Sequence, residues 1–198
     1  IDPVRYISNN SSGKMGYALA EAAVQEGAVV NLVSGPVVLT ADKSINLFKI
    51  NSAREMLEAV NTCMKSSDIF ISCAAVADYK PSKYSDTKIK KENLDNLEIN
   101  LEKNHDILSE VAEQFSSAYI VGFAAETSDV NANAKKKLDS KNLNMIISND
   151  VSDSSIGFDS DENEVHVITG SETIFIKKDK KIRIAREILN IISTNINS

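Results

Sequence analysis

Apolar residues along the chain follow two spacings, one typical of strands and the other of helices. Short apolar runs predict strands over residues 28–33, 46–50, 69–73, 97–101, 119–124 and 145–148. Between them, apolar residues recur at every third or fourth position and predict helices that begin at Lys14, Ser52, Asp106 and Asp129. The run at 69–73 is continuously apolar, as expected of a strand that is covered on both faces.

The C-terminal part has a different pattern. Residues 165–168 and 173–176 are two strand-like runs around a polar turn, which predicts a β-hairpin, and a last amphipathic helix is predicted over residues 181–192. Strands that alternate with helices form parallel sheets with right-handed connections. We therefore predict one α/β domain over residues 1–198, a Rossmann-like three-layer fold with a mostly parallel sheet, helices on both faces, and a C-terminal β-hairpin plus helix.

Composition narrows the classes of function. The formal charge of −6 disfavours nucleic-acid binding, which depends on clustered Lys and Arg. No apolar run approaches the ~20 residues that span a bilayer, and no signal peptide is present, so we expect no membrane association. The two cysteines show no metal-ligand spacing and fit free thiols in a reducing cytoplasm. Lysines gather over residues 80–91 and 135–141; composition alone favours two solvated faces over an anion site.

Residues 4–16 form a junction from strand to helix through a polar loop. Such a junction directs backbone N–H groups of Ser11–Gly13 and the positive end of a helix dipole at one point, which suits a phosphate or a carboxylate. The P-loop pattern fails because Ser8 stands at its first glycine position. The dinucleotide fingerprint fails because one of its three glycines is missing. A tight turn with an ordinary N-cap is the structural alternative.

A second polar site follows the strand at 69–73, at the end where open α/β sheets bind ligands. The small residues Ala74 and Ala75 would let a flat ring or a phosphate approach the backbone. Asp78 could accept hydrogen bonds from a ribose or lie near a Mg²⁺ ion that bridges phosphates. A capping Asp on a tight loop is the alternative.

Three further stretches suit a nucleotide. Lys88–Lys91 lies in the irregular region 77–96, where ammonium groups could follow the charge on a transferring phosphoryl group. Asn104–Leu108 begins a helix whose N–H groups could hold an anion. Val121–Thr127 ends a buried strand, and its Phe123 could stack on a base. Their alternatives are a solvated loop, a plain helix start and a core aromatic side chain.

Taken in order, these motifs resemble the phosphopantothenate–cysteine ligases over nearly the whole chain. The stretch Ser8–Gly16, with the sequence SNNSSGKMG, and the K-x-K-K pattern of Lys88–Lys91 resemble the bacterial, CTP-using branch. His105 departs from the family, which commonly has proline there. The blocks at residues 148–151 and 157–161 also resemble the family, and we expect scaffold and binding-edge roles for them.

The resemblance implies a reaction and a set of residues. The carboxylate of phosphopantothenate attacks the α-phosphate of CTP, and cysteine then displaces CMP to give phosphopantothenoylcysteine in coenzyme A biosynthesis. Mg²⁺ is the implied metal, carried by the phosphates, with Asp78 as a candidate ligand. Asn9 and Lys88 are the implied catalytic residues. The implied nucleotide contacts are Ser72, Cys73, Ala74, Asp78, Lys88, His105, Asp106, Ile107, Leu108, Phe123, Lys137 and Lys141. The implied substrate contacts are Arg5, Asn9, Ser11, Ser12, Gly13, Ala74 and Ala75.

The resemblance also implies an assembly. The family works as a homodimer with sites near the interface, so we expect Arg5 or the lysines of 88–91 to lie close to a second subunit. Family members carry a further strand ahead of Asp2–Arg5, which this chain lacks, so we expect a piece of a longer protein that also holds a flavin-dependent decarboxylase. Two other classes stay open from the residues: a nicotinamide-dependent Rossmann oxidoreductase and a non-catalytic nucleotide-binding module.

Overall fold

A computed structural model describes residues 1–90, 96–126, 130–150 and 160–197 of the chain. Its helices are α1 (Lys14–Gln25), α2 (Ala53–Met64), α3 (Ile107–Gln114), α4 (Val130–Ser140) and α5 (Lys181–Ile196). Its strands are β1 (Asn31–Ser34), β2 (Asn46–Lys49), β3 (Ile69–Ser72), β4 (Tyr79–Pro81), β5 (Leu101–Lys103), β6 (Tyr119–Glu126), β7 (Met145–Asp150), β8 (Glu162–Thr169) and β9 (Thr173–Lys180).

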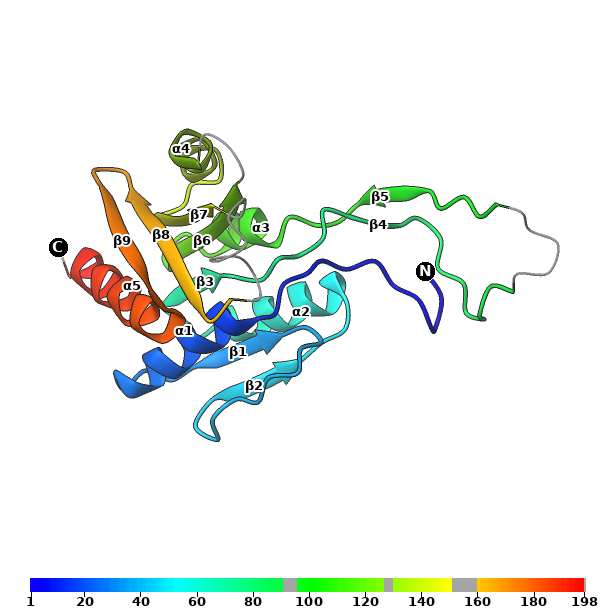
Figure 1. Ribbon diagram of the computed structural model, residues 1–198, viewed down its shortest axis with the longest axis horizontal. Coiled ribbons are helices and arrows are strands. Elements are labelled where there is room, and N and C mark those ends of the chain that lie inside the picture. Colours follow the sequence, from blue (N-terminus) through cyan, green and yellow to red (C-terminus); the bar gives the residue numbers. More distant parts are fainter. Residues whose placement is uncertain (91–95, 127–129, 151–159, 198) are drawn as a thin grey trace.

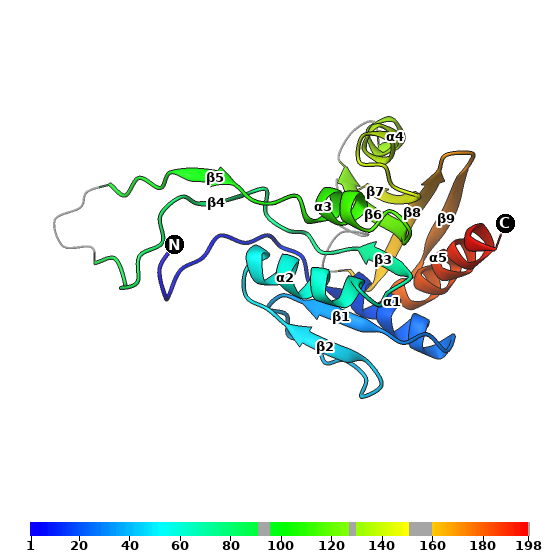
Figure 2. The ribbon, with the colours of Figure 1, turned by 180° about the vertical axis from the view of Figure 1, so that it is seen from behind.

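The main sheet has five strands in the order β3-β6-β7-β8-β9 (Figures 1 and 2). Its first three strands are parallel, and the hairpin of β8 and β9 continues the sheet in antiparallel fashion. The predicted α/β fold class is confirmed, and so are the C-terminal hairpin and the last helix. The two hairpin strands, β8 and β9, and the helix α5 are each longer than the range predicted for them.

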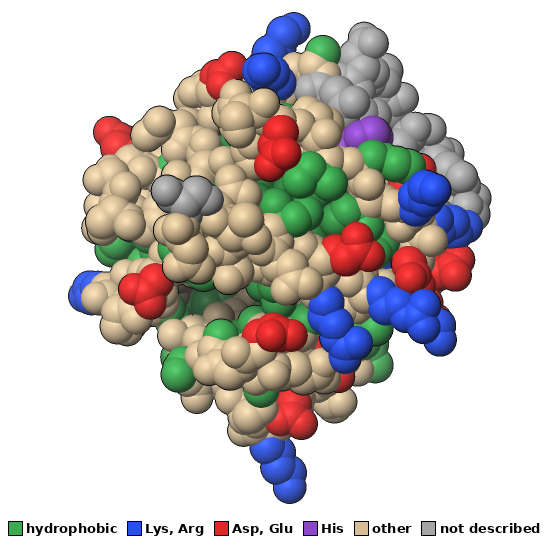
Figure 3. Space-filling view, turned by 90° about the vertical axis from the view of Figure 1, so that its left-hand side faces the viewer, with side chains coloured by type: hydrophobic (Ala, Val, Ile, Leu, Met, Phe, Trp, Pro, Cys, Tyr) green, Lys and Arg blue, Asp and Glu red, His purple; other side chains and the backbone are tan. Residues whose placement is uncertain are grey.

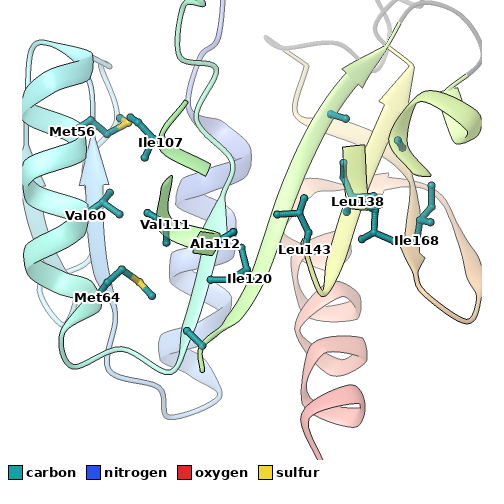
Figure 4. Close-up of a cluster of buried hydrophobic side chains, with 14 residues drawn as sticks. Met56, Val60, Met64, Ile107, Val111, Ala112, Ile120, Leu138, Leu143 and Ile168 are labelled. Atoms are coloured by element: carbon teal, nitrogen blue, oxygen red, sulfur yellow. The ribbon is translucent and has the colours of Figure 1, made fainter. Parts of the chain in front are cut away.

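Side chains of successive strand residues alternate between two cores, one on each face of this sheet. Ile120, Ile146 and Ile168 face the first core, which α2, α3 and α4 cover. Figure 4 shows side chains of α2 pointing toward α3 and toward Ile120. Val121 and Ile147 face the second core, which α1 and α5 cover. The predicted three layers are therefore present.

Strands β1 and β2 form a separate parallel pair, and among the described residues β1 makes no ladder with β3. The face seen in Figure 3 is hollowed between the part carrying this pair and the part carrying the main sheet. Both faces of β3 are covered, as predicted, since Phe70 packs against the first core and Ile71 against the second. Ile69 at its start is 39% exposed, and β3 pairs with β6 alone, so it lies at the edge of its sheet.

A long arm, made of β4, β5 and the segments that extend from them, projects away from the layers (Figures 1 and 2). The antiparallel pair β4–β5 falls inside the region predicted as irregular and just after it. The predicted strand 97–101 is wrong in its bounds, because only Leu101 of that range belongs to β5. Its alternating apolar residues Leu97, Ile99 and Leu101 are all exposed, so this alternation does not mark burial within the chain.

Two helix starts follow from local chemistry. Helix α2 follows Ser52, as predicted, and Ser52 and Glu55 form a capping box: the Ser52 hydroxyl accepts a hydrogen bond from the N–H of Glu55 at 3.2 Å, and the Glu55 carboxylate accepts from the N–H of Asn51 at 2.9 Å. Helix α1 begins at Lys14, as predicted, after Gly13 with a φ of 77°. Asp129, the predicted cap of α4, and residues 157–159 of a late motif lie outside the described residues. None of the described helices is both long and apolar enough to cross a membrane.

Candidate functional site

A small cavity of about 140 Å³ lies where the C-terminal ends of β3, β6 and β7 meet the N-terminus of α1. We call it the strand-end pocket. Sequence-predicted residues from three separate parts of the chain meet in it, namely Ser11–Gly13, Cys73–Ala75 and Phe123. Its lining residues are Ser11, Ser12, Gly13, Lys14, Met15, Gly16, Cys73, Ala74, Ala75, Phe123, Ala125, Asn149, Asn163 and Lys181.

The N-terminus of α1 forms one wall of the pocket. Gly13 occupies the N-cap position with a left-handed backbone conformation, and a Cβ there would approach the Val37 side chain to 3.0 Å. Both the conformation and the lack of space favour glycine at this position. A glycine also offers no side chain to cap the helix. The N-cap residue therefore adds no carboxylate or hydroxyl to the positive end of the α1 dipole at the pocket, which suits an anion.

Asn9 lies at the edge of the same pocket. Its side-chain amide donates to the carbonyl of Ala75, and its Oδ1 accepts from the N–H of Ser11 at 2.9 Å. The side chain thus joins the opening loop to the segment that follows β3. An amide group in this place can donate to an oxygen of a ligand held between the two segments.

The charge of the strand-end pocket is positive. Its described lining contains two cations, Lys14 and Lys181, and no acidic residue. Just outside, Lys14 pairs with Asp161 at 2.9 Å, and this hydrogen bond lowers the pKa of the Asp161 carboxyl. Burial raises the pKa of the Cys73 thiol to about 12, against the opposing charge of Lys181. Cys73 is therefore a neutral wall residue at neutral pH and not a nucleophile.

The sequence reasoning missed four polar residues of the pocket as ligand contacts: Lys14, Asn149, Asn163 and Lys181. Asn149 follows the same strand-end rule that pointed to Cys73–Ala75, and it was assigned only an edge role. Asn163 and Lys181 come to the pocket through the C-terminal hairpin, whose β8 begins and whose β9 ends on that side. No local pattern signals this return.

A second group of predicted residues surrounds the start of α3. The N–H of Asn104 donates to the carbonyl of Asp78 at 2.8 Å, and Lys141 pairs with Asp106 at 2.6 Å. The ring of His105 lies 2.8 Å from the carboxylate of Glu110. Burial acts to raise the pKa of Asp106, but hydrogen bonds from Lys141 and Ser109 outweigh it and lower that pKa. Asp106 itself caps α3, so a carboxylate already occupies the end of the helix that was predicted to hold an anion.

The side chains of Ile107 and Leu108 face the core rather than a ligand. Ile107 is buried in the first core, and Leu108 packs against it. A Cβ on Gly122 would come within 2.9 Å of Leu108 and 3.0 Å of Leu143. These two leucines fill the space beside Gly122, so no room for a ligand is left at this point of the strand. Only backbone groups of Ile107 and Leu108 are left to contact a nucleotide.

Arg5 and Lys88 belong to a third group, on the arm. The Asp2 carboxylate accepts from the Arg5 guanidinium at 2.5 Å and from the N–H of Ile89 at 3.1 Å, while Arg5 also donates to the Ile89 carbonyl at 3.3 Å. Lys88, the neighbour of Ile89, is exposed. The part of the arm that runs from β4 to residue 90 lies well away from the main sheet (Figure 1). Within one chain, Lys88 does not line the strand-end pocket.

The remaining predicted residues that the structure describes do not gather in a common site. Ser72 ends β3, and Lys137 is exposed on α4 one turn before Lys141. Among residues 1–90, 96–126, 130–150 and 160–197, no three His, Cys, Asp or Glu side chains cluster as a metal site. Asp78 therefore finds, within these ranges, no companion ligands of the kind that a protein-held Mg²⁺ would need.

The family model described as the DNA/pantothenate metabolism flavoprotein C-terminal domain matches residues 1–196. The chain belongs to this family. The resemblance drawn from the motifs is thereby confirmed at the level of the family.

Curated relatives from three bacteria carry the name coenzyme A biosynthesis bifunctional protein CoaBC. The Vibrio vulnificus protein is 45% identical over 98% of this chain, the Escherichia coli K12 protein 44% over 98%, and the Bacillus subtilis 168 protein 47% over 91%. These matches cover 49%, 48% and 43% of the respective relatives. The chain thus spans about half the length of the curated relatives it matches.

Solved structures support the same fold. The C-terminal domain of a CoaBC protein superposes with a TM-score of 0.83 at 40% identity, over 100% of this chain and 89% of that one. A Cab2 variant in complex with phosphopantothenate-cysteine superposes with a TM-score of 0.78, over 98% of this chain and 82% of that one. At 17% identity the Cab2 likeness supports the fold alone.

Proposed function

We propose that this chain is a phosphopantothenate–cysteine ligase that uses CTP. It joins 4′-phosphopantothenate to L-cysteine through an acyl-cytidylate, in the biosynthesis of coenzyme A. The names of the CoaBC relatives, the family and the motifs at Ser8–Gly16 and Lys88–Lys91 support this proposal.

The observation that carries the proposal is the charge of the strand-end pocket. In a chain of net charge −6, the described lining has two lysines, no acidic residue and the N-terminus of α1. A positive hollow on an acidic protein raises the local concentration of small anions. Phosphopantothenate and CTP are both such anions.

The proposed chemistry has two balanced steps. The carboxylate oxygen of phosphopantothenate attacks the α-phosphorus of CTP; a new O–P bond forms, the bond to the β-phosphate breaks, and pyrophosphate leaves. The cysteine amine then attacks the acyl carbon; a C–N bond forms, CMP leaves, and the amine gives up a proton. Neither step requires a nucleophilic side chain, so the protein contributes orientation and charge stabilisation.

Two residues have proposed roles in these steps. Lys88 stabilises the charge that grows on the phosphate as the cytidylate forms. Asn9 donates to the acyl oxygen while cysteine attacks, in exchange for its present bond to Ala75. Mg²⁺ would neutralise phosphate charge when bound with CTP, and because the described residues offer no metal cluster, the phosphates themselves would supply its main ligands.

The pocket of one chain is too small for the proposed ligands. Pockets that enclose ligands of this size measure about 300–1,000 Å³, against 140 Å³ here. We therefore extend the proposal to a homodimer, in which the arm of one chain brings Lys88 to the strand-end pocket of the other. The arm and the N-terminal stretch expose apolar side chains suited to such pairing, namely Val4, Tyr6, Ile7, Tyr79, Tyr84, Leu97, Ile99 and Leu101. Since the relatives are named bifunctional, we further propose that a flavin-dependent decarboxylase is fused to the chain in its natural context.

Rapid-quench kinetics with phosphopantothenate, CTP and cysteine test the assignment. Asn9→Asp should form acyl-cytidylate and pyrophosphate but little final amide, because the donor to the acyl oxygen is lost. Lys88→Gln should form little of either. Each loss should be on the order of a hundredfold in the affected step, the usual cost of one oxyanion donor.

Two neighbouring substitutions serve as matched controls. Asn10→Asp changes the charge beside Asn9, and Lys83→Gln removes another exposed lysine of the arm. Both should retain nearly normal rates. A wild-type chain that binds CTP yet releases no pyrophosphate in the presence of phosphopantothenate would instead be a non-catalytic nucleotide-binding module, and ATP run in parallel gives the nucleotide preference.

A further inference from the structure

Two neighbouring strands of the main sheet each carry an apolar row that ends in an asparagine. On β7, Ile147 is buried in the second core, and Asn149 continues the same face of the strand two residues later. On β8, Val165 is buried in that core, and Asn163 stands two residues before it. Both asparagines line the strand-end pocket. The apolar rows therefore change to carboxamides where they reach the pocket.

The carboxamide of Asn163 is buried with one end unpaired. Asn163 is 4% exposed, and its Oδ1 accepts from the N–H of Glu164 at 3.0 Å. A backbone N–H needs the oxygen of a carboxamide, so Nδ2 is the end that is left over. In the part of the chain that the structure describes, Nδ2 has no hydrogen-bond acceptor. Burying a donor without an acceptor costs free energy, so packing alone gives no reason for an asparagine here.

A β-bulge sets the direction of this side chain. The pairing of β8 with β9 changes register between Asn163 and Val165. Bulges beside binding sites turn a side chain to a direction that a regular strand would not give it. The bond from the N–H of Glu164 to Oδ1 lies within this bulge and fixes the orientation of the carboxamide. The unpaired Nδ2 is thus held in place before any ligand arrives.

The wall that the two asparagines form is polar but uncharged. Asn149 is partly buried, and its side chain, like Nδ2 of Asn163, has no hydrogen-bond partner within the described residues. Carboxamides pair well with neutral amides and hydroxyls, which also donate and accept. Met15 and Phe123 add apolar surface to the same lining. A ligand that fits this wall has a neutral, partly apolar chain with amide and hydroxyl groups.

We propose that Asn163 is a substrate-binding residue whose Nδ2 donates to a neutral oxygen of phosphopantothenate, its hydroxyl or its amide carbonyl. Asn149 binds the same hydroxy-amide unit from β7. This inference rests on the proposed function and names the part of the substrate that the β7–β8 wall recognises. The unit lies between the phosphate and the carboxylate of phosphopantothenate, so holding it orients both charged ends. Pyrophosphate, which has no such unit, gains nothing from Asn163.

The first test removes the donor from the protein. Asn163→Leu keeps the volume of the side chain but cannot donate, and isothermal titration calorimetry would measure its dissociation constants. Its affinity for phosphopantothenate should fall by about five- to thirtyfold, the size of one hydrogen bond left unmade in a buried site. Its affinity for pyrophosphate should not change. The control Asn190→Leu, at an exposed position of α5, should bind both like the wild type.

The second test removes the acceptor from the ligand. One analogue of phosphopantothenate lacks the hydroxyl, and another carries a thioamide, whose sulfur accepts only weakly. The analogue without the true acceptor should bind the wild type more weakly than phosphopantothenate does, and Asn163→Leu should not distinguish the two. A penalty of this kind for the deoxy analogue assigns the hydroxyl, and one for the thioamide assigns the carbonyl. Equal penalties with and without Asn163, for both analogues, would overturn the proposal.

A merely structural role predicts different results. If Asn163 only closes the bulge through Glu164, Asn163→Leu should lower the melting temperature and leave the affinity of the folded protein for phosphopantothenate unchanged, which would overturn the proposal. A measurement on the unaltered chain covers the case in which Asn163→Leu does not fold. The side-chain NH₂ signals of Asn163, assigned by NMR through its own Cβ, should move downfield on addition of phosphopantothenate. Signals that stay fixed at saturation would also overturn it.

These outcomes separate the binding role from the reaction. Calorimetry and NMR need no turnover, so a chain that binds phosphopantothenate through Asn163 and forms no amide refutes the ligase and leaves this inference intact. A chain that forms the amide equally well with Asn163→Leu, at substrate concentrations below saturation, refutes only this inference. A chain that binds no phosphopantothenate at all refutes both.

Discussion

At the scale of single residues, Asp2 has the most complete set of contacts in the N-terminal stretch. Its side chain is buried, and its carboxylate accepts from the N–H groups of Val4 and Arg5 at 2.9 Å, from the Arg5 guanidinium and from the N–H of Ile89. The Arg5 hydrogen bond, with the three N–H groups, lowers the pKa of Asp2 far below its ordinary value. One carboxylate thus fastens the start of the chain to the arm.

We predict that Asp2→Asn frees the arm from the N-terminal stretch. Peptides covering residues 84–90 should exchange amide hydrogen faster at pH 7, and Asp86→Asn, at an exposed position of the same arm, should not change them. Because the folded pKa of Asp2 is depressed, its contribution is complete above the ordinary aspartate pKa of about 3.9 and is lost as pH falls below it. Wild-type protection in this segment should therefore decline in acid while the variant changes little; equal protection factors at pH 7 would contradict the assignment.

The residues of the strand-end pocket differ in how far sequence could predict them. Cys73–Ala75 and Phe123 follow parallel strands, and strand ends are local features. Ser11–Gly13 precede a helix, which is also local. Lys181 carries no such signal, because a lysine at the start of an amphipathic helix usually points to solvent. Its burial depends on the β8–β9 hairpin, which returns the chain to the pocket from a distance in sequence.

At the scale of elements, α2 shows how strongly a short motif fixes a helix start. The Ser52 hydroxyl accepts from the N–H of Glu55, and the Glu55 carboxylate accepts from the N–H of Asn51. The rest of the helix packs through Met56, Val60 and Met64 (Figure 4). The motif and the spacing agree, so the start of α2 could be predicted. The arm strands could not, because pairs of three residues leave no periodic pattern and Pro81 disfavours a strand.

We predict that Ser52→Ala destabilises the chain by about 1 kcal/mol, the usual cost of losing a serine N-cap. For a domain of this size the melting temperature should fall by about 2–4 °C. Thermal unfolding followed by circular dichroism would measure it. The control is Ser116→Ala, at an exposed serine that caps no described helix, and it should unfold like the wild type. Equal melting temperatures for both variants would mean that the capping box contributes nothing to stability.

At the scale of the whole molecule, the described layers and the arm have different kinds of surface. The layers enclose two apolar cores, whereas the arm and N-terminal stretch expose aromatic and aliphatic side chains such as Tyr6, Tyr84 and Leu101. Figures 1 and 2 show these two segments extending side by side beyond the sheets. Exposed apolar side chains of this extent favour association with another surface. The apolar alternation over residues 97–101, which predicted a strand with these bounds, has a physical reason if a second chain covers it.

Complementation between two inactive variants would test whether the site is shared between chains. If Lys88 acts on the pocket of the partner, a dimer that pairs an Asn9→Asp chain with a Lys88→Gln chain has one site with both residues intact and one with neither. Mixing the two variants in equal amounts, with subunit exchange, should then restore about a quarter of the wild-type rate, since half of the dimers are mixed and each has one good site.

The same mixture gives no recovery if both residues of a site come from one chain, because every site then keeps one substitution. Light scattering after size exclusion must accompany the assay. A single chain at micromolar concentration would contradict the dimer itself, and a dimer without recovery would contradict only the exchange of arms. Leu101→Glu, which places a charge on the exposed apolar arm, should weaken the dimer and lower the recovered rate with it. The matched control replaces the Lys88→Gln chain by a Lys83→Gln chain. Because that chain keeps Lys88, it should be active without a partner variant.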